Sequence, residues 1–230
     1  MKHKDLRPWL SVIAGGESLV SHAGGVLLVE TARRSGLSEQ LRRLLGRWRL
    51  PLAIHDPGKI VTDLAIAVAL GGDAACDVAV LRAQPGVFGP VASDPTVSRL
   101  ITRLAVDADD VLTAISAARA GARERVWHHA GAPVQDGRVV IDLDATLVTA
   151  HSEKEQAAGN YKGGYGFHPL MAYCDETGEA LAAILRPGNA GSNTAADHVE
   201  VIEHALEQIP GELIETIEIL VRADCAGRNA

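Results

Sequence analysis

The stretch VVIDLDATLVT, residues 139–149, is a nearly continuous apolar run that carries two carboxylates. Such a run predicts a β-strand that is buried on both faces. Asp142 and Asp144 are two residues apart, so an extended chain directs both side chains to the same side. A buried, ionised carboxylate requires a metal ion, a basic partner or a catalytic role. The simpler alternative is that one Asp caps the strand end by accepting hydrogen bonds from backbone N–H groups.

The composition is that of an ordinary globular chain with an aliphatic core. Of its 230 residues, 47% are hydrophobic and only 3% are aromatic, which suits one or two domains. No apolar run approaches the ~20 residues that span a bilayer, and the first residues, MKHKDLRPWL, lack the features of a signal peptide. Cys76, Cys174 and Cys225 lie far apart without metal-ligand spacing. We therefore expect reduced thiols in a cytoplasmic protein that does not contact a membrane.

The charges divide the chain into two parts. Residues 1–130 hold 16 Lys and Arg against 13 Asp and Glu, whereas residues 131–230 hold 6 against 16. A mildly basic part is compatible with a polyanionic partner and an acidic part with bound cations, although solvated charged faces explain both as well. Residues 127–137 contain Gly and Pro and are expected to form a linker. The sequence thus predicts two domains, residues 1–134 and 135–230.

The first part is expected to be helical and to bind DNA. Apolar spacing predicts helices over residues 26–35, 38–48, 60–70, 74–82, 95–104 and 107–124. Four arginines accompany the second of them, Arg42, Arg43, Arg47 and Arg49. They are either a solvated basic face or a phosphate-binding face, and the pattern does not decide between the two.

The helix over residues 95–104, with Ser93 or Asp94 as its cap, has the pattern of a helix-turn-helix recognition helix. Its predicted packed face consists of Val97, Leu100, Ile101 and Leu104. Ser98, Arg99 and Arg103 are then exposed together, which suits contact with a DNA groove. Because many helices without such a role have the same pattern, DNA binding by these three residues is a hypothesis.

The second part is expected to be a small sheet with one crossover helix. Strands are predicted at residues 139–149, 165–174, 179–186 and 217–223, with a helix at 194–208 before the last strand. A right-handed crossover places the fourth strand beside and parallel to the first. Asp144 and Asp224 then lie at neighbouring strand ends, where their repulsion favours a shared cation. Oxygen ligands favour Mg²⁺ or Mn²⁺. The fold class is therefore α+β, with strand order βββαβ in the sequence.

Four ordered segments resemble one protein family. They are DLDATLV (142–148), YGFHPLMAYCDETGEAL (165–181), LRPGNAGSNTAADH (185–198) and ILVRADCAG (219–227). Together they resemble the group 1 DDE-domain transposases of bacterial insertion sequences, from about Gly24 to the last residue. The resemblance implies a helical DNA-binding region and a ribonuclease-H-like catalytic domain whose DDE acids bind two divalent metal ions. It makes Asp144 the first acid and Asp224 the second.

The resemblance also implies an activity and its partners. The expected reaction is metal-dependent cleavage and strand transfer at the terminal inverted repeats of a mobile element. The expected partners are double-stranded repeat and target DNA and, in the full-length protein, a second copy of the chain. Lys162 and Arg186 could neutralise phosphate charge, and His151 and His168 could assist, although solvated or structural roles explain all four. Asp224-Cys225-Ala226-Gly227 stands where the family usually has Asp-Ser-Ala-Gly.

The third acid of the family, a Glu further downstream, has no counterpart before Ala230. Glu203 and Glu207 lie on the preceding predicted helix and are poor substitutes. The sequence thus suggests a transposase truncated before its third acid, and it leaves the activity of the fragment alone undecided. The alternative is a non-catalytic fragment that only binds DNA ends.

A different enzyme class shares the first motif. DLDATLV also fits the DxDx[T/V] signature of haloacid-dehalogenase-like phosphatases, with Asp142 as nucleophile and Asp144 as acid/base. In that family the motif is followed by a helix, whereas a glycine-rich hairpin is expected here. No paired acidic motif follows later in the chain. The phosphatase is therefore the less favoured alternative.

Overall fold

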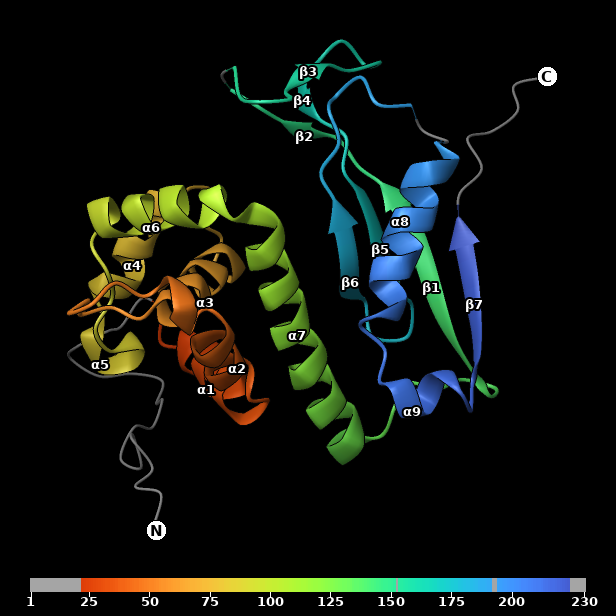
Figure 1. Cartoon of the computed structure of the whole chain (residues 1–230), viewed down its shortest axis with the longest axis horizontal. Coiled ribbons are helices and arrows are strands. Elements are labelled where there is room, and N and C mark those ends of the chain that lie inside the picture. The colour runs from red at the N-terminus through yellow and green to blue at the C-terminus, as the bar shows by residue number, and fades with distance from the viewer. Residues whose placement is uncertain (1–21, 152, 192–193, 224–230) are drawn as a thin grey trace. The chain divides into compact units, whose positions relative to one another are not determined.

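The chain folds into two compact units, residues 1–118 and 119–230, of which the computed structural model describes residues 22–151, 153–191 and 194–223. The architecture is mixed α and β, with helices in the first unit and both helices and strands in the second (Figure 1). The units divide inside one helix, α7, whereas the sequence suggested a division at residues 134 and 135. That the units are separate functional domains stays a prediction.

The described part of the N-terminal unit consists of helices and loops. These are α1 (Gly25–Arg34), α2 (Leu37–Leu44), the 3₁₀ turn η1 (Gly46–Trp48), α3 (Pro57–Ala69), the 3₁₀ turn η2 (Ala75–Asp77), α4 (Val78–Arg82), α5 (Pro85–Phe88), α6 (Asp94–Val106) and the first half of α7 (Ala108–Ala130). All six predicted helices are present, and the short α5 occupies a segment expected to be loop. Their packed faces enclose one core with Leu45, Leu81 and Phe88 at its centre. No helix in the described part of the chain is long and apolar enough to cross a bilayer.

The C-terminal unit is built on a four-stranded sheet with the order β6-β5-β1-β7. Its strands are β1 (Arg138–Ala145), β5 (Leu170–Cys174), β6 (Glu179–Ile184) and β7 (Glu218–Ala223). β1 is antiparallel to β5 and parallel to β7. The helices α8 (Ala195–Leu206) and α9 (Gly211–Ile214) connect β6 to β7, and α8 packs on β5 and β6. The prediction that the first and last strands lie side by side and parallel is confirmed.

The two faces of β1 differ. Val139, Ile141 and Leu143 are buried in the core of this unit, together with Val201 and Ala205 of α8. On the opposite face Asp142 is half-buried and Asp144 is exposed. The prediction of a strand buried on both faces was therefore wrong. The alternating side chains of β1 separate an apolar face from a face that carries both carboxylates.

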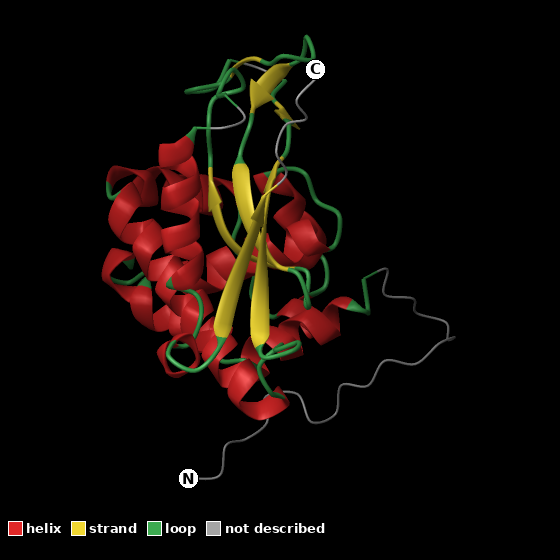
Figure 2. Cartoon of the chain, turned by 90° about the vertical axis from the view of Figure 1, so that its right-hand side faces the viewer, coloured by secondary structure: helices red, strands yellow, loops and turns green. Residues whose placement is uncertain are grey.

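A second, small sheet was not predicted. It has the order β2-β4-β3 and is formed by β2 (Val148–Thr149), β3 (Ala158–Gly159) and β4 (Tyr165–Phe167). The expected strand over residues 165–174 divides at His168-Pro169, so that β4 joins the small sheet and β5 the large one. β2 approaches β4 closely, since a Cβ atom on Gly166 would lie 2.1 Å from the Val148 carbonyl oxygen. The small sheet lies beyond the C-terminal end of β1 (Figures 1 and 2).

The sequence predicted a linker over residues 127–137, but residues 127–130 belong to α7. The indole of Trp127 is 6% exposed and lies in the core of the C-terminal unit, which explains why the helix continues. One turn earlier the buried Arg123 donates to Gln208 Oε1 at 2.8 Å and to Glu179 at 2.7 Å. The last turns of α7 are thus held in the C-terminal unit by the buried Trp127 side chain and by the hydrogen bonds of Arg123.

We predict that Trp127→Ala lowers the free energy of unfolding by about 3–5 kcal/mol, because it leaves a large cavity beside the sheet. The measurement is urea denaturation followed by far-ultraviolet circular dichroism. Val126→Ala is the matched control, since Val126 is the adjacent residue on α7 and is 43% exposed. A loss of stability as small as that of the control would show that Trp127 is not part of this core.

Candidate active site

The candidate site lies where β1 and β7 end side by side. Their register pairs Asp142 with Arg222 and Leu143 with Ala223. The next residues in the two segments are Asp144 and Asp224. Asp144 is paired in register with Met171 of β5, and its carboxylate is exposed and forms no hydrogen bond or ion pair with any described residue. Asp224 lies outside the described residues, so its predicted proximity to Asp144 remains a prediction.

Arg222 holds Asp142 in a two-pronged ion pair across the two parallel strands. Its Nε donates to Asp142 Oδ1 and its Nη2 to Asp142 Oδ2, each at 2.6 Å. Nη2 also lies 2.9 Å from Asp175 Oδ2, just after the end of β5. One guanidinium therefore connects β7, β1 and the end of β5, and we call these three residues the Arg222 clamp. The hydrogen bonds that Arg222 donates to Asp142 lower the pKa of the Asp142 carboxyl group and raise the pKa of the Arg222 guanidinium.

The two carboxylates of β1 differ in their partners. The sequence predicted a metal ion, a basic partner or a catalytic role for Asp142 and Asp144, and Asp142 has a basic partner, Arg222. Asp144 has none among the described residues. Sequence reasoning missed Arg222, although a signal was present: Arg222 precedes Asp224 by two residues, as Asp142 precedes Asp144. In a parallel register this spacing places Arg222 opposite Asp142.

Two residues that could have assisted phosphate chemistry are part of the scaffold. Arg186 is 5% exposed, and it donates through Nε to the His168 carbonyl at 2.9 Å and through Nη1 to Asp197 at 3.0 Å. His168 is 4% exposed, with Nδ1 3.1 Å from the Ala190 carbonyl oxygen. Together they fix the loop after β6 to the start of β5. Lys162 and His151, by contrast, are exposed.

The predicted DNA-binding residues lie on α6. Ser98 and Arg99 are exposed, whereas Arg103 is half-buried and donates to the Trp48 carbonyl at 3.4 Å. Val97, Leu100 and Leu104 are buried as expected, but Ile101 is 44% exposed and lies outside the packed face. The helix thus presents Ser98 and Arg99 to solvent, and Arg103 reaches along the surface toward η1.

The donor chemistry of the site suits a hard cation only in part. Asp144 offers exposed carboxylate oxygens, the ligand type that Mg²⁺ and Mn²⁺ prefer. Asp142 is occupied by Arg222. Within residues 22–151, 153–191 and 194–223, no three His, Cys, Asp or Glu side chains converge as a metal site would require. The described residues therefore contribute one free ligand, Asp144, to the proposed centre.

We predict that Arg222→Gln lowers the melting temperature at pH 6 and that this difference shrinks below pH 4. The pKa of Asp142 is lower in the folded than in the unfolded chain. Its stabilisation is therefore complete above the ordinary carboxyl value of about 3.9 and is lost as the pH falls through the lower, folded-state value. Calorimetric melting from pH 3 to pH 6 measures the effect. Arg138→Gln breaks the exposed pair with Glu218 on the same two strands and is the control. An Arg222→Gln deficit that stays constant over this range would contradict the assignment.

Comparison with known proteins identifies the family. The family model described as transposase DDE domain group 1 matches residues 2–230, nearly the whole chain. Searches among curated proteins and among solved structures found no match to it. The family match covers the helices of the first unit as well as the sheet and the acidic strand end of the second. The chain belongs to the group 1 family of transposase DDE domains.

Proposed function

We propose that this chain is the transposase of an insertion sequence, which cleaves DNA at terminal inverted repeats and transfers the cut strand to target DNA. The observation that carries the proposal is the parallel pairing of β1 with β7, which ends at Leu143 and Ala223. One further step along each chain is an aspartate, Asp144 and Asp224. If the register continues for that step, the two carboxylates are neighbours at one edge of the sheet.

The proposed catalytic fold is ribonuclease-H-like. Three consecutive antiparallel strands, β6-β5-β1, followed through α8 by a parallel fourth strand beside β1, support it. In this topology β1, which carries Asp144, is a central strand of the sheet, and β7 lies next to it. Asp144 then belongs to a rigid strand, β1, and not to a loop, which favours exact positioning of a charged centre.

Asp144 and Asp224 are the proposed ligands of divalent metal ions, Mg²⁺ or Mn²⁺. Metal ions held there would activate the attacking hydroxyl and stabilise charge on the leaving oxygen. The protein contributes the position of these ligands. Arg222 keeps Asp142 engaged, so Asp144 is the β1 carboxylate that remains available. No residue of this chain is assigned the role of the third acid.

DNA binding is proposed for the N-terminal unit, with Ser98, Arg99 and Arg103 of α6 as contacts. Ser98 and Arg99 are exposed on the same helix whose back is anchored by buried Val97 and Leu100. Short polar and arginine side chains on a rigid helix are suited to groove and phosphate contacts. The active transposase is proposed to be a homodimer, since two element ends have to be joined.

The phosphatase alternative is weakened by the Arg222 clamp. A nucleophilic Asp142 would need a free carboxylate oxygen directed at a substrate. Both of its oxygens instead accept hydrogen bonds from Arg222. The arrangement supports Asp144 and not Asp142 as the reactive carboxylate of β1.

We predict that the protein nicks a supercoiled plasmid carrying its own reading frame with flanking DNA, in the presence of Mg²⁺ or Mn²⁺. Asp144→Asn should reduce the rate at least about a hundredfold, because one metal ligand is lost. Glu203→Gln is the control and should retain activity, since Glu203 lies exposed on α8. The readout is the conversion of supercoiled to open-circular DNA with and without EDTA.

Three results would go against the proposal. Nicking that persists in Asp144→Asn would remove Asp144 from the reaction. DNA binding without any nicking by the native chain would support the non-catalytic end-binding fragment. Metal-dependent hydrolysis of p-nitrophenyl phosphate that is lost in Asp142→Asn would favour the phosphatase.

A further inference from the structure

The loop between η1 and α3 exposes a group of aliphatic side chains. It has the sequence RLPLAIH, residues 49–55, and we call it the apolar loop (Figure 1, orange). Leu52 is fully exposed, Ile54 is almost fully exposed and Leu50 is half exposed. None of them contributes to the core of the unit. Their exposure therefore requires a reason outside the packing of this unit.

Both ends of the apolar loop are fixed. Before it, the indole Nε1 of buried Trp48 donates to Asp107 Oδ2 at 2.9 Å. After it, Asp56 caps α3 by accepting from the Lys59 backbone N–H at 3.2 Å. Within it, Arg49 donates to the Ala53 carbonyl at 2.9 Å. The exposed tip is thus supported by a rigid base.

The tip stores backbone strain at its most exposed residue. The Ala53 N–H donates to the Leu50 carbonyl at 3.1 Å, which closes a four-residue turn with Pro51 in its second position. Leu52, in the third position, has a φ of 63°. Gly or Asn adopts this conformation at lower cost than a residue with a bulky side chain. Neither the positive φ nor the exposure of Leu52 stabilises the folded unit. The leucine side chain at this position therefore indicates a binding role.

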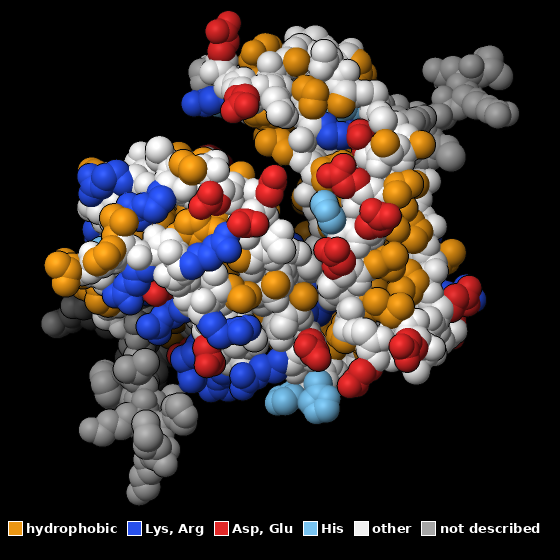
Figure 3. Space-filling view, viewed as in Figure 1, with side chains coloured by type: hydrophobic (Ala, Val, Ile, Leu, Met, Phe, Trp, Pro, Cys, Tyr) orange, Lys and Arg blue, Asp and Glu red, His pale blue; other side chains and the backbone are white. Residues whose placement is uncertain are grey.

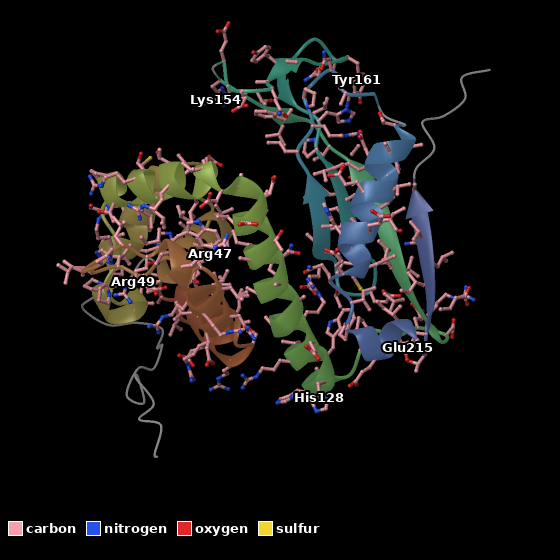
Figure 4. The ribbon with its side chains drawn as sticks, viewed as in Figure 1. Arg47, Arg49, His128, Lys154, Tyr161 and Glu215 are labelled. Carbon is pink, nitrogen blue, oxygen red and sulfur yellow. The ribbon has the colours of Figure 1, made fainter. Side chains whose placement is uncertain are left out.

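The surroundings of the apolar loop are basic. Residues 40–55 contain four arginines and no Asp or Glu, and two acids outside this range, Asp56 and Asp110, pair with three of the four. The side chains of Arg42, Arg47 and Arg49 are 64%, 57% and 44% exposed. Arg42 and Arg49 lie 3.9 Å from Asp56, a distance at which they can exchange this partner for a phosphate. Figure 3 shows Lys and Arg gathered over this unit with hydrophobic side chains among them, and Figure 4 shows Arg47 and Arg49 on it.

The apolar loop is connected to α6. Arg103, on the same helix as Ser98 and Arg99, donates to the carbonyl of Trp48, directly before the loop. The guanidinium of Arg47 lies 4.0 Å from the centre of the Trp48 ring. Arg103 of α6 and the base of the loop are therefore in contact on the N-terminal unit.

We propose that the apolar loop is a wedge that inserts Leu52 between base steps of duplex DNA while the arginines around it bind the flanking phosphates. Leucine and isoleucine can unstack a base step when cations hold the backbone on each side. A polyanionic duplex matches an apolar tip with the exposed Arg42, Arg47 and Arg49 beside it better than a second copy of this chain does. The inference rests on the proposed function, because it concerns how the same protein engages its DNA.

The test is Leu52→Asn in the full chain, with a fluorescein-labelled 30-bp duplex of random sequence as the probe. Binding should weaken about tenfold, because one apolar insertion is lost. The slope of log K against log salt should not change, since no phosphate contact is removed. The melting temperature should stay the same or rise, because Asn tolerates the positive φ. A purely structural leucine would show the opposite change in stability.

Two further variants separate the wedge from its surroundings. Arg42→Gln should weaken binding and make the salt slope shallower by about one. Leu27→Gln changes a leucine of α1 that is 70% exposed outside the loop, and it should leave binding unchanged. Fluorescence of 2-aminopurine in the duplex should rise on binding of the native chain and less with Leu52→Asn, since unstacking relieves its quenching.

The outcomes distinguish the inference from the proposed function. Native-like affinity and 2-aminopurine signal in Leu52→Asn, together with DNA binding and plasmid nicking by the native chain, would overturn the wedge alone. If the native chain binds no duplex even at low salt, the DNA-acting function fails, and the wedge fails with it. A native dimer without DNA that Leu52→Asn converts to a monomer would identify the loop as a contact between copies and would also overturn the wedge.

Discussion

The hydrogen bonding of β1 along both of its edges is the constraint on which the C-terminal unit depends. On one side β5 pairs with it in antiparallel register and on the other β7 pairs with it in parallel. A parallel neighbour requires a crossover, and α8 provides it while covering β5 and β6. Asp144 is paired with Met171 of β5 and directly follows Leu143, which is paired with Ala223 of β7. Its backbone position is therefore fixed although its side chain is exposed.

The two faces of β1 make different contacts. Val139 and Ile141 are fully buried in the core that the sheet forms with α8. On the open face, Arg222 connects three segments through Asp142 and Asp175. This charge pairing joins the parallel strands two residues before Asp144 and Asp224. The clamp therefore supports the alignment of the strands without occupying the carboxylate that we assign to the metal ions.

Much of this could be predicted from local patterns. The six N-terminal helices follow from apolar spacing, and the placement of β7 beside β1 follows from the order of elements and the handedness of crossovers. Features that depend on long-range contacts were missed. Trp127 looked like part of a linker because its core partners are far away in sequence. The small sheet depends on the close approach at Gly166, and the partner of Asp142 depends on strand register. The turn over residues 50–53 has the preferred Pro51 in its second position, but the positive φ of Leu52 in the third position is against residue preference.

The most direct test of the account is whether Asp144 and Asp224 share a metal ion. Mn²⁺ affinity can be measured by electron paramagnetic resonance for the native chain, Asp144→Asn, Asp224→Asn and the double variant. Two ligands of one ion are strongly coupled, so each single substitution should weaken binding about as much as the double one does. Losses that simply add up, or a loss from only one of the two substitutions, would contradict the central claim that β1 and β7 bring these carboxylates together.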